Sequence, residues 1–241
     1  MIVEIIGPSG AGKSFLALNV MRKLEEIGVS VEGVHEDWVG KGSLVPWWLN
    51  DPGRHNISTD LRISFWSMLF LAKCPKFSSF IIRMILSAKC SFYHKTCIAR
   101  GLWRKAGMDQ YFRRRKFQGS CVFIDEGICH SIHNFLVYPR EPVDERAVAV
   151  FADTFPLPDV LACLDGSEEQ LMDNLHERGI FSPRVEDEKD LAGFVRNSIR
   201  AFDLLMTSAR VCSNAIPLKC REPSAVLTLV KLLTKHSENS S

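Results

Sequence analysis

Short apolar runs recur along the chain and predict buried strands. Most are continuous rather than alternating, which is typical of parallel strands with helices on both faces. Segments with apolar residues at helical spacing separate them. This alternation indicates an α/β, three-layer domain with a parallel sheet of about five strands. The predicted strands lie at residues 2–6, 29–34, 121–125, 159–164 and 211–218.

Helical periodicity is clearest after the first strand. Apolar residues repeat from Phe15 onward, and Gly28 ends the pattern. Another helix follows the fourth strand. Ser167 caps its start, acidic residues occupy its first turn, and Arg178 lies in its last turn.

The stretch between the second and third strands is long and also helical in pattern. We therefore predict a helical insertion over residues 40–118 and not a separate domain. Residues 1–235 are expected to form a single domain, and residues 236–241 a frayed polar tail.

The most specific motif directly follows the first strand. It reads GPSGAGKS and matches GxxxxGK[ST], with a strand before it and a helix after it. Its glycines let successive N–H groups point at one anion, and the helix N-terminus adds its positive end. The motif predicts binding of ATP, with Lys13 on the β- and γ-phosphates and the Ser14 hydroxyl on Mg²⁺. The phosphate-binding loop comprises Gly7, Pro8, Ser9, Gly10, Ala11, Gly12, Lys13 and Ser14.

Acidic residues at two strand ends are candidates for metal and acceptor chemistry. Asp125 ends the third strand, at the edge where ligands of parallel sheets bind, and is expected to hold Mg²⁺. Glu126 follows and can polarise water or contact an acceptor. After the second strand, Glu36 and Asp37 can accept a proton from an acceptor hydroxyl or bind it. Solvated loop acids are the alternative at these two positions.

Two arginines after the fourth strand are candidates for a lid. Arg178 ends a helix, and Arg184 lies in the polar stretch 179–190. Arginines on a lid can swing onto a transferred phosphate and neutralise developing charge. Each alone is also compatible with an ordinary surface position.

The segments GPSGAGKS, VFIDEG and PLPDVLACLDGSEEQLMDNLHERG together resemble P-loop kinases of the nucleoside and nucleotide kinase group, thymidylate-kinase-like proteins in particular. The resemblance implies a P-loop NTPase fold, a phosphotransferase activity, and lid roles for Arg178 and Arg184. Glu36 resembles the acid that deoxynucleoside kinases place after strand two. The chain departs from the group at Asp125-Glu126-Gly127, where these kinases carry an arginine, so the acceptor stays open.

The amino-acid composition says little about the class of protein or its location. The 46% apolar and 24% charged residues are ordinary for a globular protein. Eight cysteines show neither CxxC pairs nor zinc-finger spacing, which favours a reduced, cytoplasmic location. The opening residues lack a basic region and a long apolar run, so we expect no secretory signal and no membrane-spanning helix.

Charge is distributed unevenly along the chain. Between Arg54 and Gln118 there are 14 basic residues and two acids, a net charge of +12 against +2 for the whole chain. Three interpretations remain open: core helices with solvated basic faces, a pocket for an anionic acceptor, or contact with an anionic membrane surface. No module for sequence-specific nucleic-acid binding is recognisable.

The leading hypothesis is a small-molecule kinase that transfers the γ-phosphoryl group of ATP to a hydroxyl or phosphate. Residues 40–118 would then form the acceptor side. The alternatives are a P-loop ATPase or nucleotide switch that acts on a partner protein, and a degenerate kinase that binds ATP and only scaffolds. An oligomer is compatible with the sequence.

Overall fold

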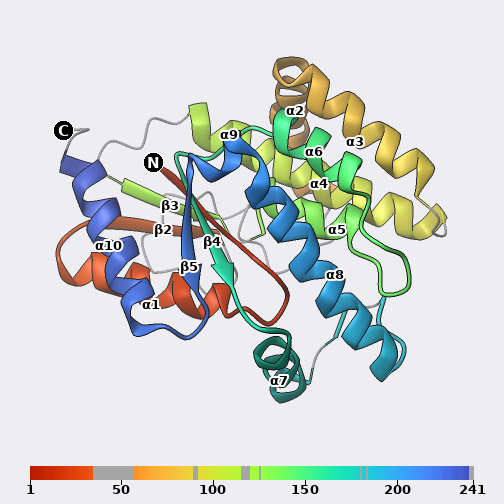
Figure 1. Cartoon of the computed structure of the whole chain (residues 1–241). Coiled ribbons are helices and arrows are strands. Elements are labelled where there is room, and N and C mark those ends of the chain that lie inside the picture. The colour runs from red at the N-terminus through yellow and green to blue at the C-terminus, as the bar shows by residue number, and fades with distance from the viewer. Residues whose placement is uncertain are drawn as a thin grey trace.

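The computed structural model describes residues 1–34, 57–88, 92–114, 120–124, 126–179, 181–182 and 184–238. Its centre is a parallel sheet of five strands in the order β2-β3-β1-β4-β5 (Figure 1). The strands are β1 (Ile2–Ile6), β2 (Ser30–Val34), β3 (Ser120–Ile124), β4 (Val160–Asp165) and β5 (Ala215–Lys219). The predicted α/β fold with an all-parallel sheet is confirmed.

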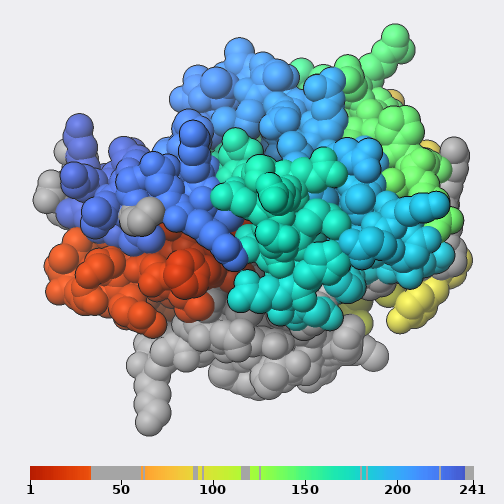
Figure 2. All heavy atoms as spheres, turned by 60° about the horizontal axis from the view of Figure 1, so that its bottom comes forward, coloured from red at the N-terminus to blue at the C-terminus, as the bar shows by residue number. Residues whose placement is uncertain are grey.

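Alternate residues of β4 enter two different cores, and this makes the fold three-layered. Ala162 and Leu164 pack with α1 (Lys13–Glu26) and α10 (Pro223–Glu238) on one face. Leu161 and Cys163 pack into the opposite core. Successive side chains of a strand point to opposite faces, so a fully buried strand has to be apolar at almost every position. Figure 2 shows α1 and α10 side by side on the surface.

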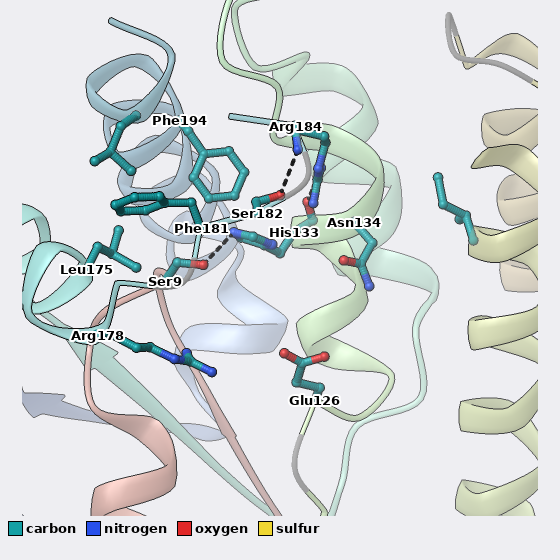
Figure 3. Close-up of a pocket in the computed structure, with 12 residues that line it drawn as sticks. Ser9, Glu126, His133, Asn134, Leu175, Arg178, Phe181, Ser182, Arg184 and Phe194 are labelled. Carbon is teal, nitrogen blue, oxygen red and sulfur yellow. Dashed lines mark hydrogen bonds between the residues drawn. The ribbon is translucent and has the colours of Figure 1, made fainter. Parts of the chain in front are cut away.

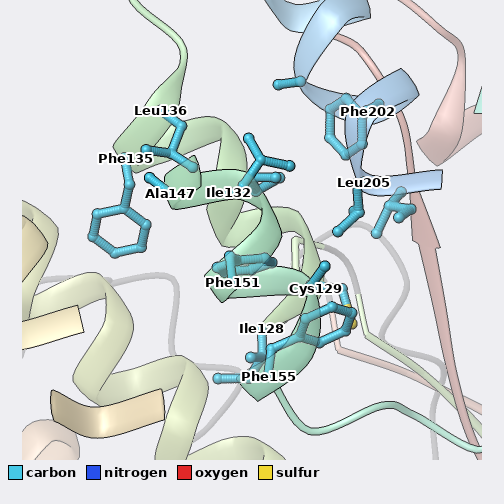
Figure 4. Packing of buried hydrophobic residues seen from close by; sticks show 14 of the residues in the cluster. Ile128, Cys129, Ile132, Phe135, Leu136, Ala147, Phe151, Phe155, Phe202 and Leu205 are labelled. Carbon is cyan, nitrogen blue, oxygen red and sulfur yellow. The ribbon is translucent and has the colours of Figure 1, made fainter. Parts of the chain in front are cut away.

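The second core is rich in phenylalanine, and part of it appears in Figure 4. Phe151 is at its centre, with ring centroids 5.7 Å from Phe77 and 5.0 Å from Phe155. Among the helices around this core are η2 (Cys129–Ser131), α5 (Ile132–Leu136), α6 (Glu145–Thr154) and α8 (Glu188–Thr207).

The described part of the insertion between β2 and β3, residues 57–88 and 92–114, is largely helical, as predicted. It contains α2 (Ile57–Lys73), α3 (Pro75–Ser87) and α4 (Phe92–Arg114). Helices α2 and α4 approach closely at Gly107, which has no side chain. A Cβ at this position would lie only 2.5 Å from Ile63. Hydrogen bonds add to this packing: the Ser67 hydroxyl donates to the carbonyl of Trp103 at 2.7 Å, and the Trp103 indole donates to Ser64 at 3.0 Å.

The predicted strand at 211–218 is wrong at its start. Residues 209–212 form the short helix α9 (Ala209–Cys212), and β5 begins only at Ala215. Arg210 stabilises the helical turn because its guanidinium donates to the carbonyls of Ala152 and Phe155, each at 2.7 Å. The helix α7 (Glu168–Arg178) has the predicted bounds, with Ser167 and Gln170 forming a capping box. In the part of the chain that the structure describes, no helix is long and apolar enough to cross a membrane.

Replacing Phe151 by alanine should lower the free energy of unfolding by about 3–5 kcal/mol, because a fully buried ring leaves a cavity. Phe15 is a matched control, since its side chain is 72% exposed on α1 and its replacement by alanine should change stability by less than about 0.5 kcal/mol. Urea unfolding measures both. Equal effects would contradict this description of the core.

Candidate functional site

The phosphate-binding loop has backbone angles that require glycine. The φ angles of Gly7, Gly10 and Gly12 are +146°, +84° and +79°. A Cβ at Gly7 would collide with the carbonyl oxygen of Leu164, and one at Gly10 would lie 2.7 Å from the carbonyl oxygen of Leu171. The loop is thus pressed against the end of β4 and the start of α7, and its curvature leaves a cradle that fits a phosphate.

Lys13 lies across this cradle at the start of α1. Its ammonium donates to the carbonyls of Gly7 at 3.1 Å and Pro8 at 2.9 Å. Ser14, the next residue, is exposed on the first turn of the helix. A cation and a helix N-terminus therefore meet at one place, and both attract a polyphosphate.

The side chains of Asn174 and Arg221 support the phosphate-binding loop. The amide of Asn174 on α7 donates to the carbonyl of Gly10 at 2.7 Å, and Arg221 in turn hydrogen-bonds to Asn174. Arg221 follows β5 with a left-handed φ of +59°. The turn after β5 is therefore linked to the phosphate-binding loop.

A pocket of about 320 Å³ opens beside the loop (Figure 3). It is bounded by the phosphate-binding loop, the turn after β3, helices α4, α5, α7 and α8, and the segment after α7. Its lining residues are Ser9, Ile98, Glu126, His133, Asn134, Leu175, Arg178, Phe181, Ser182, Arg184, Leu191 and Phe194.

Glu126 presents a carboxylate to this pocket. Its backbone is left-handed, with φ +49°, which is uncommon for a residue other than glycine and often marks a functional position. Its side chain is 60% exposed and lies 3.8 Å from the ammonium of Lys105 on α4. The next residue, Gly127, touches Glu4, since a Cβ there would lie 2.6 Å from the Glu4 carboxyl carbon.

Glu4 anchors the turn that carries Glu126. It is buried on β1, where its carboxyl group accepts hydrogen bonds from the N–H groups of His130 at 2.8 Å and Cys129 at 3.3 Å. Burial raises the pKa of Glu4 from 4.5 to about 7, and these hydrogen bonds, together with the charge of Lys105, oppose the rise. The carboxyl group therefore changes protonation near neutral pH while holding the turn after β3.

His133 connects the phosphate-binding loop to the pocket. Its Nε2 lies 3.1 Å from the Ser9 hydroxyl, and its ring stacks on that of His130 at a centroid distance of 5.4 Å. Burial lowers the pKa of both histidines well below the usual range. The charges of Lys13 and Lys105 lower the pKa of both further, and Arg184 also lowers that of His133. Both rings are therefore neutral at physiological pH.

The two arginines differ in what holds them. The guanidinium of Arg184 donates to the carbonyls of His133 at 3.1 Å and Val137 at 2.6 Å, and it lies 5.4 Å from the centre of the Phe194 ring. Arg178 is exposed, and in Figure 3 its side chain extends into the pocket toward Glu126. Arg184 thus fastens the segment after α7 to α5, whereas Arg178 is positioned to reach a ligand.

The structure brings together four residues predicted from the sequence, because Ser9, Glu126, Arg178 and Arg184 line one pocket. Glu36, Asp37 and Asp125 lie outside the described residues.

The sequence analysis missed His133, Asn134 and Asn174. The pair His130-x-x-His133, close behind Asp125 and Glu126, was a usable signal for the first of these, since residues three apart share a helix face.

Two solved structures of deoxyadenosine kinase from M. mycoides are similar in fold. The structure with bound dATP is 15% identical, has a TM-score of 0.48, and is matched over 98% of this chain and 98% of that chain. The structure with the products dCMP and a flexible dCDP is 13% identical, has a TM-score of 0.47, and is matched over 99% and 100%. No protein-family model and no curated protein matches the sequence. Likeness at this level does not assign an activity.

Replacing Glu4 by glutamine should flatten the pH dependence of stability. The raised pKa means that the folded state keeps a proton that the unfolded state releases above pH 4.5. The stability contribution is therefore full below pH 4.5 and is lost as the pH rises to about 7. The difference of 2.5 pKa units corresponds to a loss of roughly 3 kcal/mol.

Urea unfolding of both proteins between about pH 5 and pH 8 tests this prediction, and other titrating groups cancel in the difference. Parallel stability curves for the wild type and the variant would show that Glu4 does not titrate in this window.

Replacing Arg184 by glutamine should destabilise the fold by about 1–3 kcal/mol, because two backbone carbonyls lose a charged donor. The same replacement at Arg178 is the control and should change the free energy of unfolding by less than about 0.5 kcal/mol. If the two variants unfold alike, Arg184 does not fasten the segment after α7 to α5.

Proposed function

We propose that this protein is an ATP-dependent phosphotransferase, a small-molecule kinase of the nucleoside-kinase-like type. It transfers the γ-phosphoryl group of ATP to a hydroxyl or phosphate of a small acceptor. The observation that carries the proposal is the shared pocket, in which the phosphate-binding loop, the Glu126 carboxylate and the Arg178 side chain meet. Phosphoryl transfer needs the donor phosphate, the acceptor and a charge-neutralising group to lie together in one pocket.

The donor side uses the loop and the start of α1. The backbone N–H groups of residues 9–13 cradle the phosphates, and Lys13 exchanges its contacts with the Gly7 and Pro8 carbonyls for contacts with phosphate oxygens. The exposed hydroxyl of Ser14 is suited to hold Mg²⁺, and Asp125 is the proposed second ligand. The metal ion supplies neutralisation of phosphate charge.

The acceptor side is the part of the pocket between Glu126 and α4. The Glu126 carboxylate orients an acceptor hydroxyl and accepts its proton, a role for which Glu36 and Asp37 are the other candidates. The Lys105 ammonium beside Glu126 favours an acceptor that carries an anionic group. Phe181 and Phe194 provide apolar walls.

The lid has two functions in this proposal. Arg178 moves onto the transferred phosphoryl group and neutralises its charge. Arg184 stays on the carbonyls of α5 and keeps the segment after α7 next to His133, whose ring contacts Ser9. The neutral His133 orients the Ser9 hydroxyl without adding a competing charge.

The exposed Glu126 also supports a second candidate, an ATPase or nucleotide switch. A carboxylate next to the metal-binding acid can polarise a water molecule that attacks the γ-phosphate. Without an acceptor in the pocket, the same geometry would release ADP and phosphate.

Incubation of the protein with labelled ATP, Mg²⁺ and panels of nucleosides, nucleotides, sugars and lipid-linked acceptors separates the two candidates. We expect label to move to an acceptor. Replacing Lys13 by alanine should abolish transfer, and replacing Glu126 by glutamine should lower kcat while ATP binding persists. ADP release that needs no acceptor and disappears in Glu126→Gln would instead establish the ATPase.

Replacing Arg178 by alanine should reduce kcat by about 10²–10³-fold with little change in the KM for ATP, because the guanidinium acts on charge that develops in the transition state. Steady-state kinetics measures this effect, and Arg196→Ala on the exposed face of α8 is the control. A rise in KM with unchanged kcat would show that Arg178 only binds ATP.

A further inference from the structure

Four large apolar side chains are exposed where α3 ends and α4 begins. Phe92 is 81% exposed, Tyr93 77%, Leu86 71% and Ile82 53%. We call these four residues the apolar tip. Ile82 and Leu86 share a face of α3 because they are four residues apart, and Phe92 and Tyr93 open α4. Isolated exposed apolar residues are common, but such a group marks an interaction surface.

A hydrogen bond ties the two parts of the tip together. The Lys95 ammonium on α4 donates to the carbonyl of Leu86 on α3 at 2.8 Å. The end of α3 and the start of α4 meet at the right-hand edge of Figure 1, on the side opposite α1 and α10. The tip is therefore a continuous surface at one end of the molecule.

The charged residues of the chain segment that forms the tip have a single sign. Residues 61–108 contain no Asp or Glu, whereas Lys and Arg recur throughout that stretch. Lys76 and Arg83 are exposed on α3, and they are seven residues apart, which places them on the same side of that helix. Lys76 lies in the first turn of α3 and Arg83 lies one turn before Leu86. An apolar tip on a helix whose charged residues are all basic is complementary to a surface that has an apolar interior and anionic groups at its boundary.

From these observations we infer that the apolar tip inserts into the interface of an anionic lipid membrane and holds the protein there peripherally. Leu86, Ile82 and Phe92 enter the boundary between headgroups and acyl chains, Tyr93 lies at headgroup level, and Lys76 and Arg83 contact lipid phosphates. No described helix is long and apolar enough to span a bilayer. The inferred attachment is to one surface of the membrane.

A second copy of the chain fits this surface less well. A two-fold contact places each patch against itself, so Lys76 and Arg83 of one copy would approach the same cations of the other. Nucleic acid matches the charge but offers nothing comparable to the acyl region for Ile82 and Leu86. Of these three partners, a lipid surface is the one that uses both the apolar and the basic side chains.

The attachment also places the pocket near the surface. Ile98 lines the pocket and is six residues after Phe92 on α4, a distance of about 9 Å along the helix. A protein held by its tip would therefore have its pocket close to the headgroups. The membrane contact does not depend on the proposed kinase activity, and the two are tested separately.

Sedimentation of the full chain with vesicles tests the inference. We expect binding to vesicles of phosphatidylcholine with phosphatidylglycerol, little binding to phosphatidylcholine alone, and weakening by salt. The paired variants Leu86→Ser/Phe92→Ser and Lys76→Gln/Arg83→Gln should each reduce the bound fraction at least about tenfold. The control pair on α10, Leu227→Ser and Lys231→Gln, should bind as the wild type does. Urea unfolding verifies that all variants are folded.

Four results would overturn the inference. One is the absence of vesicle binding by the wild type. Another is vesicle binding that the tip variants leave unchanged. The third is a dimer in sedimentation equilibrium that the tip variants convert to monomer, and the fourth is a preference for DNA over anionic vesicles. Either of the last two would assign the tip to a different partner. Loss of phosphoryl transfer with vesicle binding intact would count against the proposed function only.

Discussion

The contact between Gly7 and the Leu164 carbonyl determines where the parts of the site lie. It forms because β1 and β4 are paired neighbours, with Ile6 opposite Cys163, so that both strands end at the same edge of the sheet. No side chain fits between the loop and β4. The helix that follows β4 consequently starts beside the loop, where Asn174 supports Gly10 and Arg178 reaches the pocket. A wider separation of the two strands would remove the loop support and the arginine together.

Glu4 has the corresponding role on the other side of β1. A carboxyl group buried in the central strand is costly unless it is hydrogen-bonded, and the two N–H groups of the turn after β3 supply those bonds. In return, Glu4 determines the path of that turn and so the positions of Glu126 and His133. The pocket thus depends on two contacts, one made by Glu4 within β1 and one made by Gly7 directly after it.

The sequence was informative where local chemistry determines structure. The phosphate-binding loop, the parallel strands and the capped helix α7 follow from glycine positions, apolar runs and a capping residue, and all are local signals. Arg184 shows what local patterns leave out. Its role in a lid stays a prediction, and the sequence did not indicate that its guanidinium would bind carbonyls in and just after α5, about 50 residues earlier in the chain. His133 was missed for the same reason, because its contact with Ser9 spans two separate elements. The helix at 209–212 depends on a distant contact of Arg210.

Under the proposed function, the left-handed backbone at Glu126 sets the stability of the fold against the chemistry of the site at one position. An L-residue in this conformation carries about 1–2 kcal/mol of strain that glycine would not have. Selection for stability alone would therefore drive this position toward glycine, and the resulting protein would be sturdier but would lack a carboxylate in its pocket. Variants of this protein selected for heat stability after random mutagenesis are expected to lose the acid at position 126 early. The residue found at position 126 would then show whether selection had acted on folding or on activity.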